Sequence, residues 1–385
     1  MPHDSTPAPS PPTVAPLQVG LIGFGYAGRS LHAPLIQASP DLSLAAVSSR
    51  QADAVHADCG AGVRVVGSPE ALATDPALDL VVIASPNHSH ARLAALALSS
   101  GHHVLIDKPF ALTAAEAAPL LALAEQHQRV LSVFHNRRWD ADFLTAQALL
   151  ATGDAGPLGR LTDARLCFDR FRPVVRARWR EGDGPGAGLW LDLGPHLIDQ
   201  ALRLFGMPLA LQADITRQRP GGLSDDAFEC RLRYANGLRV TLAASMLAAL
   251  PGPRFALHGL RGSWVKQGLD AQEDALKAGS RPDPQQPQAW GHDPQAGMLC
   301  VLPASAASLA AGGAGDATPG VDIPIAQAHP NLPGRWPDFY PQLAAAIRGQ
   351  GPNPVLAAQA LQVMAMLDLG RASHQQRREL TVQPA

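Results

Sequence analysis

Cysteine is rare in this chain of 385 residues. Its four cysteines lie far apart in the sequence, at Cys59, Cys167, Cys230 and Cys300, and no CxxC pair is present. The spacing argues against a structural zinc site and against a disulfide framework. We therefore expect no metal site, and a reducing compartment such as the cytoplasm.

The chain also has no large excess of positive or negative charge and no long apolar run. Lysine plus arginine total 31 and aspartate plus glutamate total 33, giving a net charge of −2. A surface for nucleic acid is therefore not expected. No apolar run reaches membrane-spanning length, so we expect no membrane partner. Residues 1–16 are rich in proline and lack the apolar core of a signal peptide, which predicts a disordered tail.

The first half of the chain alternates short apolar runs with helical patterns. A chain of this length usually folds into two domains. Continuous apolar strands separated by helices are typical of a parallel sheet covered on both faces. We predict a doubly wound, Rossmann-type α/β domain over residues 17–136. Its expected strands are Gln18–Ile22, Leu42–Ser48, Val63–Val66, Leu78–Ala84, His103–Ile106 and Val130–Phe134.

The pattern changes after residue 137, where strands begin to follow one another directly. Asn236-Gly237 between two apolar runs predicts a two-residue hairpin turn. An antiparallel sheet is expected, so residues 137–385 are predicted to form an α+β domain. Residues 270–320, rich in Pro, Gln, Ala and Gly, are expected to form a surface excursion with little regular structure. The predicted strand 161–171 and the helices 140–151, 191–205, 339–348 and 357–369 complete this half.

A glycine-rich motif follows the first predicted strand and opens a helix. It reads Gly23-Phe24-Gly25-Tyr26-Ala27-Gly28. The first glycine permits a tight turn, the second lets a pyrophosphate approach the backbone, and the third lets helix and strand pack closely. The helix N-terminus then faces the phosphates. The motif predicts dinucleotide binding.

The end of the second strand bears on which nicotinamide cofactor is used. An NAD site usually has an acidic residue there, which accepts a hydrogen bond from the ribose 2′-hydroxyl. This chain instead has Ser48, Ser49 and Arg50. Two hydroxyls and a guanidinium can bind a 2′-phosphate through charge-assisted hydrogen bonds. We favour NADP, with NAD as the alternative if Arg50 is an ordinary surface residue.

Polar residues follow the fourth strand, at the sheet edge where ligands of α/β proteins bind. The segment from Ser85 to His90 contains two histidines, and His102-His103 lies nearby in sequence. No carboxylate or thiolate accompanies them locally, so a metal site is disfavoured. We expect a helix cap and a wall for the nicotinamide ribose, with Ser85, Pro86, Asn87 and His90 contacting the cofactor.

The fifth strand ends at Asp107-Lys108-Pro109. A lysine at this position points into the cleft where a nicotinamide would lie, and its ammonium can stabilise developing alkoxide charge. Asp107 and Lys108 are therefore expected beside the cofactor, although a solvated lysine is the simpler alternative. The chain must turn sharply here, which predicts a cis Lys108–Pro109 bond.

Asp192 and His196 are four residues apart at the start of a predicted helix, so they share one face. A carboxylate beside an imidazole holds its tautomer and raises its pKa, which suits a proton shuttle near neutrality. A helix cap with a buried, satisfied histidine is an equally good interpretation of the spacing.

These segments together resemble the glucose-fructose oxidoreductase / inositol dehydrogenase / MocA family. The resemblance rests on GFGYAG, SPNHSH, DKPF and DLGPH in that order, and covers roughly residues 17–270 and 335–370. The segments around Ser132–Asp140, Phe168–Pro173 and Arg178–Glu181 are most similar to the NADP-dependent scyllo-inositol dehydrogenases. Members usually carry Glu-Lys-Pro where this chain has Asp107, so any contact of that carboxylate must be rearranged.

The resemblance implies a Rossmann domain, a second domain with an open, mostly antiparallel sheet, and a polyol or sugar substrate bound between them. Lys108 would be the family lysine, His196 the proton-transfer residue and Asp192 its carboxylate partner. A homodimer or homotetramer is expected. Alternatives are a reductase of a non-sugar carbonyl, a nicotinamide-assisted glycosidase and a nucleotide-sensing regulator without turnover. Expected substrate contacts are His135, Asn136, Arg138, Trp139, Arg170 and Arg172, each equally explained by a cap or an ion pair.

Overall fold

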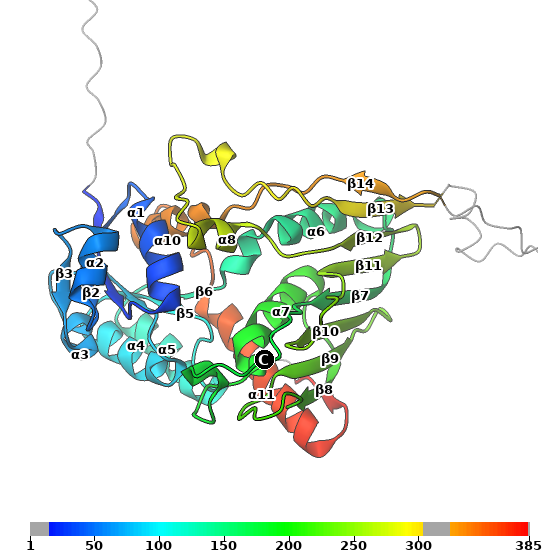
Figure 1. Ribbon diagram of the computed structural model, residues 1–385, viewed down its shortest axis with the longest axis horizontal. Helices are drawn as coiled ribbons and strands as arrows, with labels where there is room; N and C mark the ends of the chain where they lie inside the picture. The colour runs from blue at the N-terminus through cyan, green and yellow to red at the C-terminus, as the bar shows by residue number, and fades with distance from the viewer. Residues whose placement is uncertain (1–14, 303–323, 384–385) are drawn as a thin grey trace, which may run out of the picture.

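Two sheets lie side by side, each packed against helices (Figure 1). The structure is a computed structural model that describes residues 15–302 and 324–383. Nearly all of the predicted disordered tail, residues 1–14, lies outside the described residues, as does the 303–320 part of the predicted surface excursion. Among the described residues, no helix is both long and apolar enough to cross a membrane.

The first domain is the predicted doubly wound sheet. Its six strands are all parallel and lie in the order β3-β2-β1-β4-β5-β6. Every residue of β4 is buried, as expected for a strand covered on both faces. The strands are β1 Leu17–Ile22, β2 Leu42–Ser48, β3 Arg64–Val66, β4 Leu80–Ile83, β5 His103–Asp107 and β6 Leu131–Phe134.

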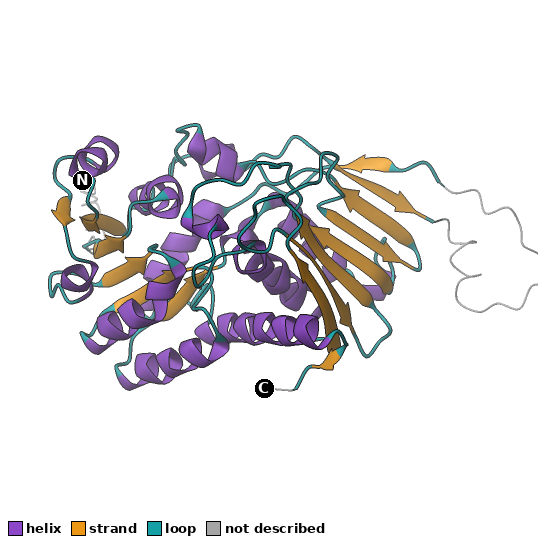
Figure 2. Ribbon diagram, turned by 60° about the horizontal axis from the view of Figure 1, so that its bottom comes forward, coloured by secondary structure: helices purple, strands orange, loops and turns teal. Residues whose placement is uncertain are grey.

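Helices cover both faces of this sheet (Figure 2). Thr113 caps one of these helices: its hydroxyl accepts from the Glu116 amide at 3.2 Å, while the Glu116 carboxylate accepts from the Leu112 amide. The helical segments are η1 Gly28–His32, α1 Ala33–Gln37, α2 Ala52–Cys59, α3 Pro69–Ala73, η2 Asn87–Ser89, α4 His90–Ser99 and α5 Ala114–Gln126.

The second domain contains a nine-stranded sheet in the order β14-β13-β12-β11-β7-β10-β9-β8-β15. Within the described residues only β7 and β10 pair in parallel, and the other neighbouring strands of this sheet pair antiparallel. The strands are β7 Leu161–Cys167, β8 Ala210–Thr216, β9 Ala227–Arg233, β10 Arg239–Ser245, β11 Phe255–Gly259, β12 Gly262–Lys266, β13 Gly297–Val301, β14 Gln327–His329 and β15 Leu380–Thr381.

Helices α7 and α11 pack on one face of the nine-stranded sheet, and in the described part of the chain its other face carries no helix (Figure 2). α11 also contacts α5 and β6, which joins the C-terminal segment to the first domain. The helical segments are η3 Asn136–Trp139, α6 Ala141–Ala151, η4 Gly153–Ala155, η5 Trp179–Glu181, α7 Leu189–Phe205, α8 Gln272–Lys277, η6 Pro287–Ala289, η7 Trp336–Asp338, α10 Phe339–Ile347 and α11 Ala357–Gln376.

Two local predictions were wrong. The predicted β9–β10 hairpin forms, but its turn has three residues, 235–237, rather than two. The Tyr234 amide donates to the Leu238 carbonyl oxygen across the turn, and Gly237 adopts a positive φ of 88°. The segment after residue 270 contains both α8 and β13. Gln272 holds α8 in place, because its side-chain oxygen Oε1 accepts from the Trp290 indole N–H and from the Trp336 backbone N–H.

Candidate active site

The glycine-rich turn after β1 has the geometry that its sequence predicts. Gly23 has φ +97°, and a Cβ there would come within 2.7 Å of the Ala84 carbonyl oxygen. A Cβ on Gly28 would collide with the Gly23 carbonyl oxygen, at 2.0 Å. A Cβ on Gly25 would meet nothing within 4 Å. Open space therefore lies beside Gly25, at the start of the first helix, where a phosphate can approach the backbone.

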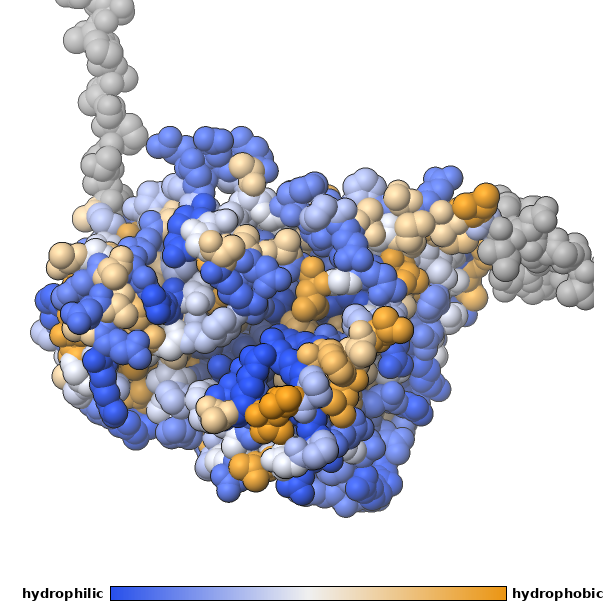
Figure 3. Space-filling view, viewed as in Figure 1, coloured by the Kyte–Doolittle hydropathy of each residue, from blue (hydrophilic) through white to orange (hydrophobic). Residues whose placement is uncertain are grey.

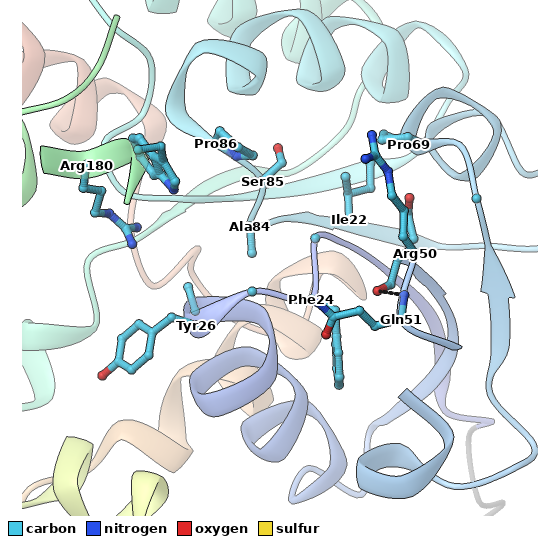
Figure 4. Close-up of a pocket in the computed structure, with 17 residues that line it drawn as sticks. Ile22, Phe24, Tyr26, Arg50, Gln51, Pro69, Ala84, Ser85, Pro86 and Arg180 are labelled. Carbon is cyan, nitrogen blue, oxygen red and sulfur yellow. Dashed lines mark hydrogen bonds between the residues drawn. The ribbon is translucent and has the colours of Figure 1, made fainter. Parts of the chain in front are cut away.

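A cavity of about 360 Å³ runs along this turn, and we call it the glycine-loop cleft (Figure 4). Arg50 and Gln51 lie at one end, and Tyr26 and Arg180 at the other. The cleft is lined by residues 22–27, 48–51, 67, 69, 84–86, 179 and 180. An elongated cleft with open space in its middle fits a dinucleotide whose pyrophosphate lies beside Gly25.

Ser48, Ser49 and Arg50 all line this cleft. The Ser49 hydroxyl accepts from the Gln51 amide at 3.0 Å, which fixes the loop after β2. Within the described ranges the Arg50 guanidinium has no hydrogen-bond or ion-pair partner. No carboxylate lies among the lining residues. The arrangement therefore leaves a cation at the end of the cleft where the ribose 2′ position of a dinucleotide would lie.

The loop after β4 divides into two roles. Ser85 and Pro86 line the glycine-loop cleft, as expected. His90 does not line it: the ring is fully buried and lies between the carbonyl oxygens of Pro109 and Ser85, at 2.8 and 2.9 Å. Asn87 is also buried and donates to the Gly186 carbonyl at 3.0 Å. His90 and Asn87 therefore hold neighbouring loops together. Neither lines the glycine-loop cleft, where both were expected to contact the cofactor.

A second cavity of about 330 Å³ adjoins the cleft, and we call it the interdomain cavity. Both cavities share Tyr26, Ala27 and Arg180 in their walls. Its lining combines β5, α7 and α8 with the segment after β7. Figure 3 shows strongly hydrophilic side chains gathered around the hollow between the two domains. The lining residues are 26, 27, 31, 107, 108, 136, 137, 170, 172, 176, 178, 180, 192, 193, 196, 273 and 277.

Lys108 reaches the second domain from the end of β5. Its Nζ donates to the Asp192 carbonyl oxygen at 2.7 Å and to the Asp192 carboxylate at 3.1 Å. The Lys108–Pro109 peptide bond is cis, as the sequence predicts. Burial alone would raise the pKa of Asp192, but Lys108, Arg180 and Arg170 outweigh it and hold that pKa below its usual range. The Asp192 carboxylate is therefore ionised at neutral pH.

His196 lies on the wall of the same cavity, one helical turn after Asp192. Asp192 was expected within hydrogen-bond reach of Lys108 or His196, and it binds Lys108. The buried His196 Nδ1 has no partner in the described part of the chain. The expected rise in the pKa of His196 is wrong. Burial, followed by the charges of Lys108 and Arg137, lowers the pKa of His196 well below 6.5. The imidazole is therefore neutral near pH 7 and able to accept a proton.

Asp107 lines the interdomain cavity, and its shorter side chain faces His32, with His32 Nε2 3.7 Å from its carboxylate. His32 Nδ1 lies 2.7 Å from the Tyr340 hydroxyl. Burial would raise the pKa of Asp107, but His32 and Lys108 lower it further than burial raises it. With aspartate in place of the family's usual glutamate, this carboxylate faces a buried histidine of the first domain.

The six expected substrate contacts separate into two groups. Asn136, Arg170 and Arg172 line the interdomain cavity. Arg138 instead forms a buried pair with Asp199, at 2.6 and 2.9 Å. The His135 ring is buried off the lining and the Trp139 ring packs edge-on against Phe339. Arg138, Trp139 and His135 therefore do not line the cavity.

Several lining residues were not anticipated. Arg137, beside the expected Arg138, lies over the Phe168 ring at 4.6 Å and pairs with Glu273 of α8. Glu273 also accepts from the Tyr26 hydroxyl. Burial raises the pKa of Glu273, but Arg137, Tyr26 and Lys277 lower it to about 2. The i, i+4 spacing of Glu273 and Lys277 could have indicated a helix here. It lies in a stretch whose composition predicted little regular structure.

No group of three or more His, Cys, Asp or Glu side chains in the described ranges has a metal-binding arrangement. A fixed cation and a neutral imidazole facing one cavity beside a dinucleotide cleft suit the transfer of a proton to or from an oxygen while a hydride moves.

The fold and site together define a dinucleotide-dependent oxidoreductase. The oxidoreductase family profile with an NAD-binding Rossmann fold matches residues 17–135, and the GFO/IDH/MocA C-terminal domain profile matches residues 143–265. The chain belongs to the GFO/IDH/MocA oxidoreductase family. It is a dehydrogenase or reductase with a small-molecule substrate and an NAD(P)-binding domain.

Named relatives align over nearly the whole chain. The protein called "Uncharacterized oxidoreductase YdgJ" of Escherichia coli (strain K12) is 45% identical over 94% of this chain and 98% of its own length. The scyllo-inositol 2-dehydrogenase (NADP⁺) IolW of Bacillus subtilis (strain 168) is 31% identical over 95% and 96%. A solved oxidoreductase structure from Bacillus cereus superposes with a TM-score of 0.80, at 27% identity over 96% and 99%.

Proposed function

We propose that the chain is an NADP-dependent dehydrogenase that oxidises a secondary alcohol of a sugar or cyclitol, or reduces the matching ketone. The observation that carries the proposal is the placement of Lys108 and His196 on one cavity wall beside the glycine-loop cleft. The name of IolW, a scyllo-inositol 2-dehydrogenase that uses NADP⁺, supports both the substrate class and the cofactor.

The proposed roles follow from charge and protonation. The Lys108 ammonium donates to the reacting oxygen and stabilises negative charge that develops on it. His196, neutral near pH 7, accepts the hydroxyl proton during oxidation. Asp192 acts as a positioning residue, because it binds Lys108 through both its carboxylate and its carbonyl oxygen. A bound nicotinamide supplies the site that accepts or releases the hydride.

The proposed cofactor preference rests on Arg50. Its side chain lies at the end of the glycine-loop cleft away from Arg180 (Figure 4), and Ser48 and Ser49, which precede it in the chain, also line the cleft. A carboxylate at this position would repel a 2′-phosphate, and none lines the cleft. The same geometry still admits NAD, which lacks only the phosphate contact.

A spectrophotometric panel tests the proposal. Inositols and aldoses are offered with NADP⁺ and with NAD⁺, and cofactor reduction is followed at 340 nm. We expect turnover of at least one polyol, faster with NADP⁺, and a fall in kcat of about 10²–10⁴-fold in His196→Asn. Turnover of non-sugar carbonyls alone would favour a carbonyl reductase instead. Cleavage of a glycoside without net cofactor reduction would favour a nicotinamide-assisted glycosidase.

A further inference from the structure

The interdomain cavity carries a marked excess of positive charge. Among its lining residues, cationic side chains outnumber carboxylates by eight to three. A neutral polyol needs hydrogen-bond donors and acceptors in similar measure, because each hydroxyl both donates and accepts. The charge balance of this wall is therefore far from what a neutral substrate requires.

All three carboxylates of the cavity already have cationic or hydrogen-bonding neighbours. Asp192 binds Lys108, and Glu273 is held by Tyr26, Arg137 and Lys277. Asp107 faces His32, 3.7 Å away. Asp192 also lies 3.7 Å from the Arg180 guanidinium. No lining carboxylate forms an ion pair with Arg170 or Arg172 in the described part of the chain.

The Arg176 guanidinium has no partner among the described residues, but that side chain is exposed to solvent. Arg170 and Arg172 are the half-buried cations left without a partner. Neither guanidinium has a hydrogen-bond or ion-pair partner anywhere in residues 15–302 or 324–383. The Arg170 guanidinium lies 5.0 Å from the centroid of the Phe168 ring. Burial and, for Arg172, the charges of Arg170, Arg176 and Arg178 lower the pKa values of both groups. Like charges held together without a counter-ion cost stability, and such sites are commonly functional.

The backbone aims these two side chains in the same direction. The amides of Arg170 and Arg172 donate to the carbonyl oxygens of Ser245 and Met246, at 2.8 and 2.7 Å, and Phe171 forms an isolated bridge with Leu247. The segment after β7 is therefore extended and runs alongside the end of β10. Alternate residues of an extended strand point to the same side. Phe171 between them is 57% exposed on the other side. Two guanidiniums thus project together into the cavity.

The phosphates of a dinucleotide do not account for this pair. Only Arg180 among the cavity's arginines also lines the glycine-loop cleft, so it is the one placed to meet the cofactor. Arg178 is occupied by Glu181, at 2.7 Å. Arg170 and Arg172 lie outside the cleft lining.

We infer that the substrate is an anionic polyol, a sugar or cyclitol bearing a carboxylate or a phosphate, and that Arg170 and Arg172 bind its anionic group. This inference rests on the proposed oxidation of a polyol hydroxyl at Lys108 and His196. Paired guanidiniums are well suited to planar carboxylates and to phosphates, which accept several N–H donors at once. The anionic group would sit at the second-domain wall of the cavity.

The test uses matched sets of one ring with and without the charge. The NADP⁺-saturated protein is offered D-glucose, D-glucuronate and glucose 6-phosphate, and myo-inositol with a myo-inositol monophosphate. We expect kcat/KM to be at least about tenfold higher for a charged member than for its neutral counterpart, and to fall with added NaCl only for the charged member. The better arm, carboxylate or phosphate, identifies the anionic group.

Variants assign the preference to the two arginines. Arg170→Gln and Arg172→Gln should each lower kcat/KM for the charged member by about 10- to 100-fold, mainly through KM, the scale of a lost charge-assisted hydrogen bond. The ratio of kcat/KM for the charged member to that for the neutral member should therefore fall towards one. Arg231→Gln makes the same charge change on a side chain of β9 that is 71% exposed, and should alter neither. Arg172→Gln, the less buried of the pair, remains informative if Arg170→Gln fails to fold.

Thermal melting separates this inference from the proposed function. The charged member should raise the Tm of the NADP⁺-saturated wild type and raise it less in Arg172→Gln. Turnover of neutral polyols without any preference for charge would overturn the inference and leave the proposed function standing. A charge-specific, Arg172-dependent rise in Tm without turnover would support anion recognition and overturn the proposed reaction. Neither turnover nor a Tm shift would overturn both.

Discussion

The pH dependence of oxidation tests the protonation state of His196. The side chain is 6% exposed, and burial with the charges of Lys108 and Arg137 lowers its pKa well below 6.5. The neutral imidazole is the form that accepts a proton. We therefore expect kcat/KM for oxidation to be level near pH 7 and to fall only when the pH approaches the lowered pKa. Reduction needs the protonated form, so its optimum should lie at lower pH.

The size of the effect of Lys108 can be worked from its charge. A unit charge on the order of 6 Å away contributes roughly 2–3 kcal/mol at an effective dielectric constant of about 20, or about two pKa units. The Asp192 carboxylate, 3.1 Å from Nζ, offsets part of that field. We call the fall in kcat/KM at low pH the acid limb. We expect Lys108→Gln to move this limb upward by about one pH unit and also to lower kcat.

The assay follows NADP⁺ reduction at 340 nm with saturating cofactor and constant ionic strength across the pH range. Arg231→Gln removes a distant, exposed charge and should leave the limb in place. His196→Asn should abolish it. A wild-type limb at or above pH 6.5, or the same limb in His196→Asn, would refute the assignment of this group.

Three further predictions concern the cofactor and the buried charges. Arg50→Ala should weaken NADP binding by about 1.5–3 kcal/mol and leave NAD binding nearly unchanged; equal titration curves for both cofactors in the wild type would contradict it. Asp199→Ala leaves the buried Arg138 unpaired and should cost about 3–5 kcal/mol of unfolding free energy in urea, with kcat/KM of the folded enzyme changed less than about twofold because Arg138 does not line the cavity. Burial lowers the pKa of His135 from 6.5 to about 4, so the unfolded chain binds a proton that the folded chain does not. The unfolding free energy should therefore fall as the pH drops from 6.5 towards 4, by up to about 1.4 kcal/mol per pH unit for this group. In His135→Leu, the unfolding free energy measured by chemical denaturation should fall less steeply with decreasing pH than in the wild type.

The first domain was predictable because its strands are continuous apolar runs and the residues expected to bind the cofactor follow the ends of these strands, at one edge of the sheet. Local spacing placed Lys108 at a strand end and His196 on a helix face, and both line the interdomain cavity. The partner of Asp192 was not predictable from spacing. A residue four positions away competes with an ammonium 84 positions earlier, and the contact that forms depends on how the two domains pack.

The second domain was harder for a related reason. Arg137 and Arg138 are adjacent on one short helical turn, so a one-residue difference decides which faces the cavity and which pairs with Asp199. Glu273 lies on a six-residue helix in a stretch whose composition indicates a loop. That helix is held by Gln272 through contacts with Trp290 and Trp336, distant partners that no local pattern reveals.

The contact between Lys108 and Asp192 joins the two domains through groups that also serve the proposed chemistry. A hinge motion that parts the domains must separate this ion pair, take Lys108 away from His196 and admit water to the cavity wall. The imidazole would then regain a more ordinary affinity for protons, and the reacting oxygen would lose its cationic donor. Any conformer in which the domains part would therefore lack the arrangement on which the proposed chemistry depends.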